Sequence, residues 1–291
     1  MLRKFFVATG VLACGAAIVL SQNTSPITGQ WTLGGPPVGD ITEGMVRLTI
    51  QRTSATSNMN SSSPVAVNQL RGLTRGQLDS SGVVARFELP RDAGTFRFEG
   101  YLQHGSGGGT FTFSPNPNFA AEMGALGFSG LTDEKTFMMA VHDVSAAWVR
   151  EMNALGIRPE SSDQLITMRI HNVTVEYIKD FRALGYSNLT PDRLVTMRIH
   201  GVTPDFARDL KANGYTDVSP DQMVTMRIHG ASLAFIKDVA ALGYSHPSID
   251  QLVTMRIHGV TPDYIRKTRS LGMGTLTIDQ LVSLRIHGIV E

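Results

Sequence analysis

The chain has 291 residues, a formal net charge of +1 and a single cysteine, and 42% of its residues are hydrophobic. The nearly neutral charge argues against a strongly basic nucleic-acid-binding protein and against an acidic tail. One cysteine forms no internal disulfide and no thiolate metal site, so a hydrophobic core must hold the chain together, and a chain of this length favours two domains.

The N-terminal segment has the order of a secretory signal peptide. Two basic residues precede an apolar run over residues 5–20, and polar residues follow. The run is shorter than the about 20 residues that a membrane-spanning helix needs. We therefore expect residues 1–21 to direct export and to be cleaved, which would leave a periplasmic or extracellular protein. The alternatives are lipidation at Cys14, whose surroundings loosely resemble a lipobox, and an uncleaved membrane anchor.

Residues 22–114 are rich in Gly, Ser, Thr and Asn, with short stretches that alternate apolar and polar residues. This alternation predicts strands with one buried face. The predicted strands cover residues 30–33, 45–50, 84–89, 94–102 and 110–113. The last two flank a glycine-rich turn, so we predict a hairpin in which Phe96 and Phe98 face Phe111 and Phe113.

The rest of this region predicts a small antiparallel sheet, built as a half-barrel or a sandwich. Residues 54–64 form a Ser/Asn-rich stretch and are predicted to be a loop, and residues 72–78 one short helical turn. A half-barrel has room for an apolar ligand. A plainly packed sheet is the interpretation that we favour.

From residue 115 to residue 291 the sequence repeats with a period of 29 residues. The string Thr-Met-Arg-Ile-His begins at Thr167, Thr196, Thr225 and Thr254, and a near-copy begins at Ser283. Such a period is typical of a solenoid, in which each unit buries its apolar face against its neighbours. The predicted fold is therefore α+β with two domains, the sheet and an α-solenoid of helical hairpins.

One repeat shows how a hairpin is built. Thr190 caps the first helix and Pro191 opens it, its apolar residues run to Ile199, and the helix stops at Gly201. The second helix begins after Thr203 and ends at Gly214. Other repeats place Asp143, Asn172 or glycine at the position of Gly201, and these residue types tolerate a left-handed turn.

The arginines and histidines of the repeated string are the candidate binding residues of the repeat surface: Arg169, His171, Arg198, His200, Arg227, His229, Arg256, His258, Arg285 and His287. We expect the histidines to cap helix C-termini. A metal site is not predicted, because no carboxylate or thiol recurs beside them. We expect the arginines to form ion pairs between repeats with aspartates such as Asp192 and Asp221.

No sequence motif of a zinc peptidase, a serine hydrolase, a phosphate loop or a dinucleotide site is present, so we predict no enzyme, no metal and no cofactor. Nucleic-acid recognition is not expected either, because a code of one base per repeat needs variation at the contact positions, and these Arg and His residues barely vary.

The string Arg-Asp-Ala-Gly-Thr-Phe-Arg-Phe-Glu-Gly at residues 91–100, the string Gly-Thr-Phe-Thr-Phe at 109–113 and the repeats of the type His-Gly-Val-Thr-Pro-Asp-Tyr are specific motifs. They resemble the C-terminal extensions of bacterial beta-lactam-sensor-type membrane metallopeptidases and of anti-sigma-factor-like envelope proteins. The resemblance implies an exported accessory module with a sheet and repeats. It does not include the peptidase, so no proteolytic residue is carried over.

These observations leave three hypotheses for function: a non-catalytic protein-binding or scaffold protein of the bacterial envelope, a sensor module that works with a separate metallopeptidase or anti-sigma factor, and a hydrolase with an unrecognised site. The sequence ends on the first helix of a repeat, so we expect an exposed apolar end that contacts a partner or a second copy of the chain. The residues of this end are Leu281, Leu284, Ile286 and Ile289.

Overall fold

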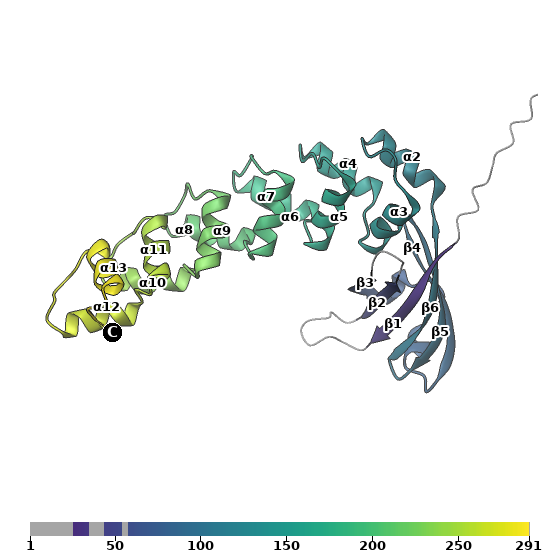
Figure 1. The fold of residues 1–291 in the computed structure, drawn as a ribbon, viewed down its shortest axis with the longest axis horizontal. Helices are drawn as coiled ribbons and strands as arrows, with labels where there is room; N and C mark the ends of the chain where they lie inside the picture. Colours follow the sequence, from purple (N-terminus) through teal and green to yellow (C-terminus); the bar gives the residue numbers. More distant parts are fainter. Residues whose placement is uncertain (1–25, 35–43, 54–57, 291) are drawn as a thin grey trace, which may run out of the picture.

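The computed structural model describes residues 26–34, 44–53 and 58–290, and the predicted signal peptide with Cys14 lies outside them. Six strands lie in the first part of the described chain, and all helices except two short ones follow the last strand, which confirms the α+β class (Figure 1). Within these ranges no helix combines the length and the apolar character that a membrane crossing requires.

The strands form one antiparallel sheet, not the two layers of a sandwich. They are β1 (Ile27–Gly34), β2 (Met45–Thr53), β3 (Asn58–Ala66), β4 (Val83–Arg91), β5 (Gly94–Gln103) and β6 (Ser106–Pro115), in the order β3-β2-β1-β6-β5-β4. The predicted hairpin is confirmed, because Phe96 lies opposite Phe113 and Phe98 opposite Phe111. The sandwich alternative is therefore wrong.

The predicted loop over residues 54–64 is also wrong for its described part, because β3 begins at Asn58. Among the described strands this one pairs with β2 alone and forms one edge of the sheet. An edge strand exposes much of its surface to water, so serines and asparagines with low strand propensity are tolerated there.

Aromatic side chains fill the inner face of the sheet. Trp31 packs edge-on against Phe87, and the phenylalanines of β5 and β6 contact one another. The chain between β3 and β4 crosses this face with η1 (Val67–Gln69) and α1 (Arg75–Leu78), and α1 is the predicted helical turn. The inner face of the sheet is thus packed with buried side chains.

Twelve helices follow the sheet within the described residues, and all have nine residues except α9, which has ten. The even-numbered helices are α2 (Pro117–Ala125), α4 (Ala146–Ala154), α6 (Val175–Ala183), α8 (Pro204–Ala212), α10 (Leu233–Ala241) and α12 (Pro262–Ser270). The odd-numbered helices are α3 (Asp133–Val141), α5 (Ser162–Ile170), α7 (Pro191–Ile199), α9 (Pro220–His229), α11 (Ile249–Ile257) and α13 (Ile278–Ile286). Within each set, consecutive helices begin 29 residues apart.

The helix ends follow the predicted signals. The hydroxyl of Thr190 accepts a hydrogen bond from the backbone of Arg193, and Ser219 and Gln222 form a capping box. Gly201 has a φ of 66°, and Asp143 and Asn172, at the same place in earlier repeats, have a φ of 54°. The left-handed turns predicted from glycine, asparagine and aspartate are therefore confirmed.

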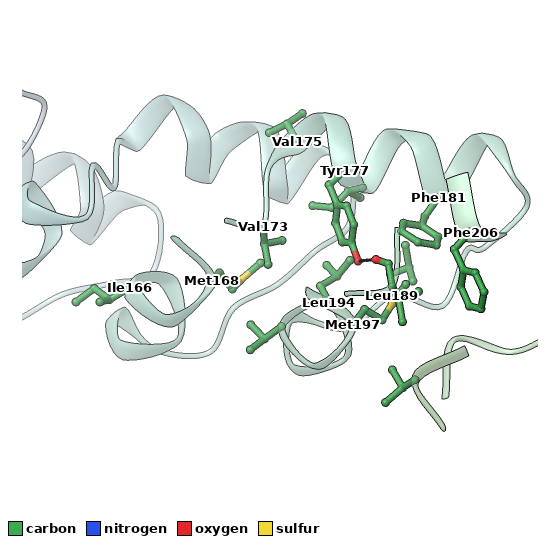
Figure 2. Close-up of a cluster of buried hydrophobic side chains, with 14 of the residues drawn as sticks. Ile166, Met168, Val173, Val175, Tyr177, Phe181, Leu189, Leu194, Met197 and Phe206 are labelled. Atoms are coloured by element: carbon green, nitrogen blue, oxygen red, sulfur yellow. Dashed lines mark hydrogen bonds between the residues drawn. The ribbon is translucent and has the colours of Figure 1, made fainter. Parts of the chain in front are cut away.

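Odd-numbered helices contact one another in succession from α3 to α13, and even-numbered helices do so from α2 to α8 and between α10 and α12. Figure 1 shows the helices extending away from the sheet in this order. A buried cluster that includes Met168, Tyr177 and Leu194 fills the space between them (Figure 2). Ile199 was expected in this apolar stripe, but its side chain is 54% exposed.

Candidate functional site

The arginines of the repeated string lie between successive repeats. Nε of Arg169 donates to the carbonyl oxygen of His142 at 3.1 Å, Arg198 does the same to His171 at 3.2 Å, and Arg256 to His229 at 3.3 Å. Each bond joins residues 27 positions apart. Each arginine therefore satisfies a carbonyl group that the end of the preceding odd-numbered helix leaves free.

Each of the five arginines of the repeated string, which we call the arginine row, also covers an aromatic ring of an even-numbered helix. The guanidinium carbon of Arg198 lies 4.6 Å from the ring centre of Tyr177. The other four pairs are Arg169 with Trp148, Arg227 with Phe206, Arg256 with Phe235 and Arg285 with Tyr264, at 5.1 to 5.3 Å. Cation–π contacts of this kind stabilise by about 0.5 to 2 kcal/mol, depending on burial. These arginines therefore mainly connect neighbouring repeats, because their guanidinium groups contact aromatic rings and backbone carbonyl groups of the protein itself.

The expected ion pairs between these arginines and the first-turn aspartates are wrong. Those aspartates contact the third residue of the preceding odd-numbered helix instead, as Asp221 does with Arg193 at 2.9 Å and Asp192 with Gln164 at 2.6 Å. Of these five arginines, only Arg169 forms an ion pair within the described residues, with Asp143 at 2.8 Å. Side chains 28 residues apart meet because stacked helices align their equivalent turns.

The histidines lie at the C-terminal ends of the odd-numbered helices, as predicted. The ring Nδ1 of His287 lies 2.7 Å from the carbonyl oxygen of Ser283 and donates to it, which caps α13. His171, His200 and His258 are half-buried, and His229 is exposed. In the described ranges, no group of three or more His, Cys, Asp or Glu side chains converges as a metal site would require.

Sequence reasoning missed a second cation row, on the even-numbered helices. Nζ of Lys211 donates to the carbonyl oxygen of Leu184 at 2.5 Å and lies over Tyr186, and Arg269 donates to Leu242 at 2.5 Å. These bonds again span 27 positions. The signal that could have identified the row is the basic residue at one position of the 29-residue period, Arg182, Lys211 and Arg269, which Ala240 interrupts.

Sequence reasoning also missed a row of exposed isoleucines. Each is the isoleucine of the repeated string, and 52 to 57% of each residue is exposed: Ile170, Ile199, Ile228, Ile257 and Ile286. The same position in five successive odd-numbered helices thus carries an apolar side chain in water. We call these five residues the isoleucine row.

At the C-terminal end, the predicted apolar stripe is largely covered. Leu281 is fully buried and Leu284 partly so, while Ile286 and Ile289 are exposed. The backbone after α13 folds back, because the amide of Ile289 donates to Leu284 and Arg285 donates to the carbonyl of Val290. The exposed surface expected at this end is therefore limited to two isoleucines, one of which belongs to the isoleucine row.

The turn between β4 and β5 joins the sheet to the helices. Asp92 accepts a hydrogen bond from the backbone of Ala146 at the start of α4, at 2.7 Å, and its carbonyl accepts one from the side chain of Asn116. The side chain of Phe137 in α3 packs among Phe96, Phe111 and Phe113 of the sheet. Sheet and helices therefore share one hydrophobic core.

Beside this junction lies a groove of about 930 Å³. Strand β3 lines one side, and the ends of α3 and α5 line the other together with Arg91. Asp143 contacts two guanidinium groups there, Nε of Arg91 at 3.4 Å and Arg169 at 2.8 Å. Burial lowers the pKa of Arg91, which the charge of Asp143 partly offsets, and burial also lowers the pKa of His142, with Arg169 adding to the effect. We call this feature the β3 groove.

A comparison of the chain with protein-family models, with curated proteins and with solved structures finds no match.

Proposed function

We propose that this chain is an exported, non-catalytic protein-binding or scaffold module, and that the isoleucine row is its contact surface. The carrying observation is the exposure of five isoleucines at one repeated position. Burying an isoleucine side chain stabilises by about 1.5 to 3 kcal/mol, so a regular row of them in water favours association with an apolar partner surface.

In this function, the helices after residue 115 act as an α-solenoid of 29-residue hairpins and as a unit distinct from the sheet. The equal spacing of the helices and the two rows of cations that join consecutive repeats support it. A stack fastened in this way holds the isoleucines at fixed intervals. The sheet packs against α3 and covers the apolar end where the stack begins.

The N-terminal sequence supports export. The resemblance of the strings at residues 91–100 and 109–113 and of the repeats supports a bacterial envelope as the place where this binding occurs. The alternative proposals remain a sensor module for a separate metallopeptidase or anti-sigma factor, and a hydrolase. The sensor module predicts that the captured partner is a metallopeptidase or an anti-sigma factor, which the binding experiment below identifies, whereas the hydrolase predicts turnover of a substrate.

The experiment places a photo-cross-linking residue at Ile199, Ile228 or Ile257, one at a time, in the full chain. Arg208, an exposed residue of α8, serves as the matched control position. We expect the same envelope protein to be captured from all three isoleucine positions and not from the control. The double change Ile228→Ser and Ile257→Ser should weaken that capture at least tenfold while leaving stability within about 0.5 kcal/mol per site, because both side chains are exposed. Equal capture from position 208, or capture that ignores the double change, would contradict the proposal.

A further inference from the structure

The β3 groove carries a second inference, and of the isoleucine row only Ile170 is among the residues that line it. Strand β3 is one edge of the sheet, and no strand of residues 26–34, 44–53 and 58–290 pairs with its outer side. The opposite edge, β4, is partly covered, because the backbone of Arg71 exchanges two hydrogen bonds with Glu88 at 2.8 Å. Of the two sheet edges, β3 is therefore the one open along its length.

The pairing of β3 with β2 determines which of its backbone groups point to the open side. The amide of Val67 donates to the carbonyl of Gly44 at 2.9 Å, which makes this a hydrogen-bonded pair. Hydrogen-bonded and non-hydrogen-bonded pairs alternate along an antiparallel ladder. Asn60 and Ser62 are consequently in non-hydrogen-bonded pairs with β2, and their N–H and C=O groups face the β3 groove.

Pro64 occupies the next such position and has no N–H group, which limits pairing at that end of the strand. The segment that remains able to accept another strand is Asn58 to Ser62. An extended peptide is the ligand whose own N–H and C=O groups match this edge. A compact small molecule satisfies only part of it.

The far side of the β3 groove supplies the charge. Arg91 is largely buried, with 14% of its side chain exposed, and its Nε is buried without a hydrogen-bond partner. A guanidinium group has five N–H donors, and the only charged partner that the described residues give Arg91 is Asp143, at 3.4 Å. Arg169 shares this carboxylate and donates to the carbonyl of His142, which also offsets the partial negative charge at the end of α3.

Two guanidinium groups thus face one carboxylate, and the donors of Arg91 exceed the acceptors around it. A carboxylate is the group that best satisfies a buried guanidinium group, since it accepts two parallel hydrogen bonds. We propose that the β3 groove binds an extended peptide segment that adds to the edge of β3 and places an Asp or Glu side chain against Arg91.

The test uses the full chain and the acetylated and amidated peptide Thr-Val-Thr-Glu-Thr-Val-Thr, with Gln or Lys in place of Glu as matched controls. The blocked ends exclude recognition of a terminal carboxylate. We expect the Glu peptide to shift the amide NMR signals of residues 58–63, 65 and 66, and the affinities of the Gln and Lys peptides to be at least about tenfold lower. A Glu peptide with N-methyl groups on alternate residues should not bind, because it cannot pair with a strand.

Two variants test the protein side. Ser62→Pro removes an N–H group that β2 does not use and should abolish binding, whereas Ser62→Ala should retain it. Arg91→Gln should remove the preference for Glu over Gln, and its melting temperature shows whether it folds. If that variant is unstable, the Gln and Lys peptides still test the preference for a carboxylate side chain.

Equal affinity for the three peptides, NMR shifts outside β3 and the groove, or no binding at about 1 mM peptide would overturn the proposal. A concentration-dependent dimer that Ser62→Pro disrupts would also overturn it, because the occupant would then be a second copy of β3. Loss of this binding leaves the cross-linking result at the isoleucine row unaffected, so the two proposals fail separately.

Discussion

At the scale of single residues, equivalent side chains in different repeats have different partners. The hydroxyl of Tyr177 donates to the carbonyl of Val202 at 2.7 Å in the buried cluster (Figure 2). Tyr264 occupies the same position three repeats later, and its hydroxyl oxygen is buried without a hydrogen-bond partner. Tyr264 therefore serves as a control for the contribution of the Tyr177 hydrogen bond to stability.

We predict that Tyr177→Phe lowers the free energy of unfolding by about 1 kcal/mol, because it leaves a buried carbonyl without its donor. Tyr264→Phe should be neutral or slightly stabilising, since it removes a buried hydroxyl group that bonds to nothing. Urea denaturation of both variants measures the difference. Equal losses for the two would show that the hydrogen bond of Tyr177 contributes little.

A second residue-scale prediction compares two left-handed glycines. Gly214 and Gly243 have φ values of 90° and 86°, but a methyl group on Gly214 would lie 2.8 Å from Nε2 of His246, while one on Gly243 would meet nothing within 4 Å. Gly243→Ala should therefore cost only the backbone strain of about 1 to 2 kcal/mol. Gly214→Ala should cost more, because His246 is stacked on Tyr215 and must move. Thermal unfolding measures which variant loses more stability. An equal or larger loss for Gly243→Ala would contradict the contact between Gly214 and His246.

The third concerns His142, whose pKa is below its ordinary value of 6.5 because of burial and the charge of Arg169. Arg91 and Asp143 also line this region. Since the pKa is lower in the folded chain, the unfolded chain binds more protons, and stability falls as the pH drops through about 6.5 and below. His142→Gln should reduce the loss of melting temperature between pH 7 and pH 5. An unchanged pH profile would mean that other groups govern this loss.

At the scale of helices and strands, the sequence period predicted the helices, caps and left-handed turns, because these depend on residues within one repeat. It did not predict the partners of Arg198 or the exposure of Ile199, because both depend on how one repeat stacks on the next. Strand β3 was missed for a similar reason: its Ser and Asn residues indicate a loop unless the partner strand is known. The β3 groove requires the arrangement of sheet and helices and has no local sequence signal.

At this scale, the contacts of Arg198 with the preceding repeat can be tested by substitution. Arg198→Lys keeps the charge but loses the Nε hydrogen bond to His171 and the planar contact with Tyr177. We expect a loss of about 1 to 2 kcal/mol in unfolding free energy. Arg208→Lys, in an exposed ion pair with Asp205, is the control and should change stability by less than about 0.5 kcal/mol. Equal effects would indicate that Arg198 acts only as a surface charge.

At the scale of the whole molecule, Phe137 connects the sheet to the first helices. It is fully buried, and Phe→Ala in a core costs about 3 to 5 kcal/mol. The chain has two tryptophans, Trp31 in the sheet and Trp148 in α4, which report on either side of this contact. We predict that Phe137→Ala lowers the denaturant midpoint reported by the fluorescence of each tryptophan. The two transitions are measured separately in the single-tryptophan variants Trp31→Phe and Trp148→Phe. A midpoint of Trp148 that does not move would show that sheet and helices unfold independently.

The cation bonds between repeats all have the same direction along the chain, and this bears on folding during synthesis. A carbonyl at the end of one repeat receives its donor from a residue 27 positions later. On a ribosome adding about 5 to 20 residues per second, each repeat therefore waits roughly one to five seconds for the side chain that secures it. During synthesis, the most recently made repeat therefore lacks these bonds until the repeat that supplies the donor has been added.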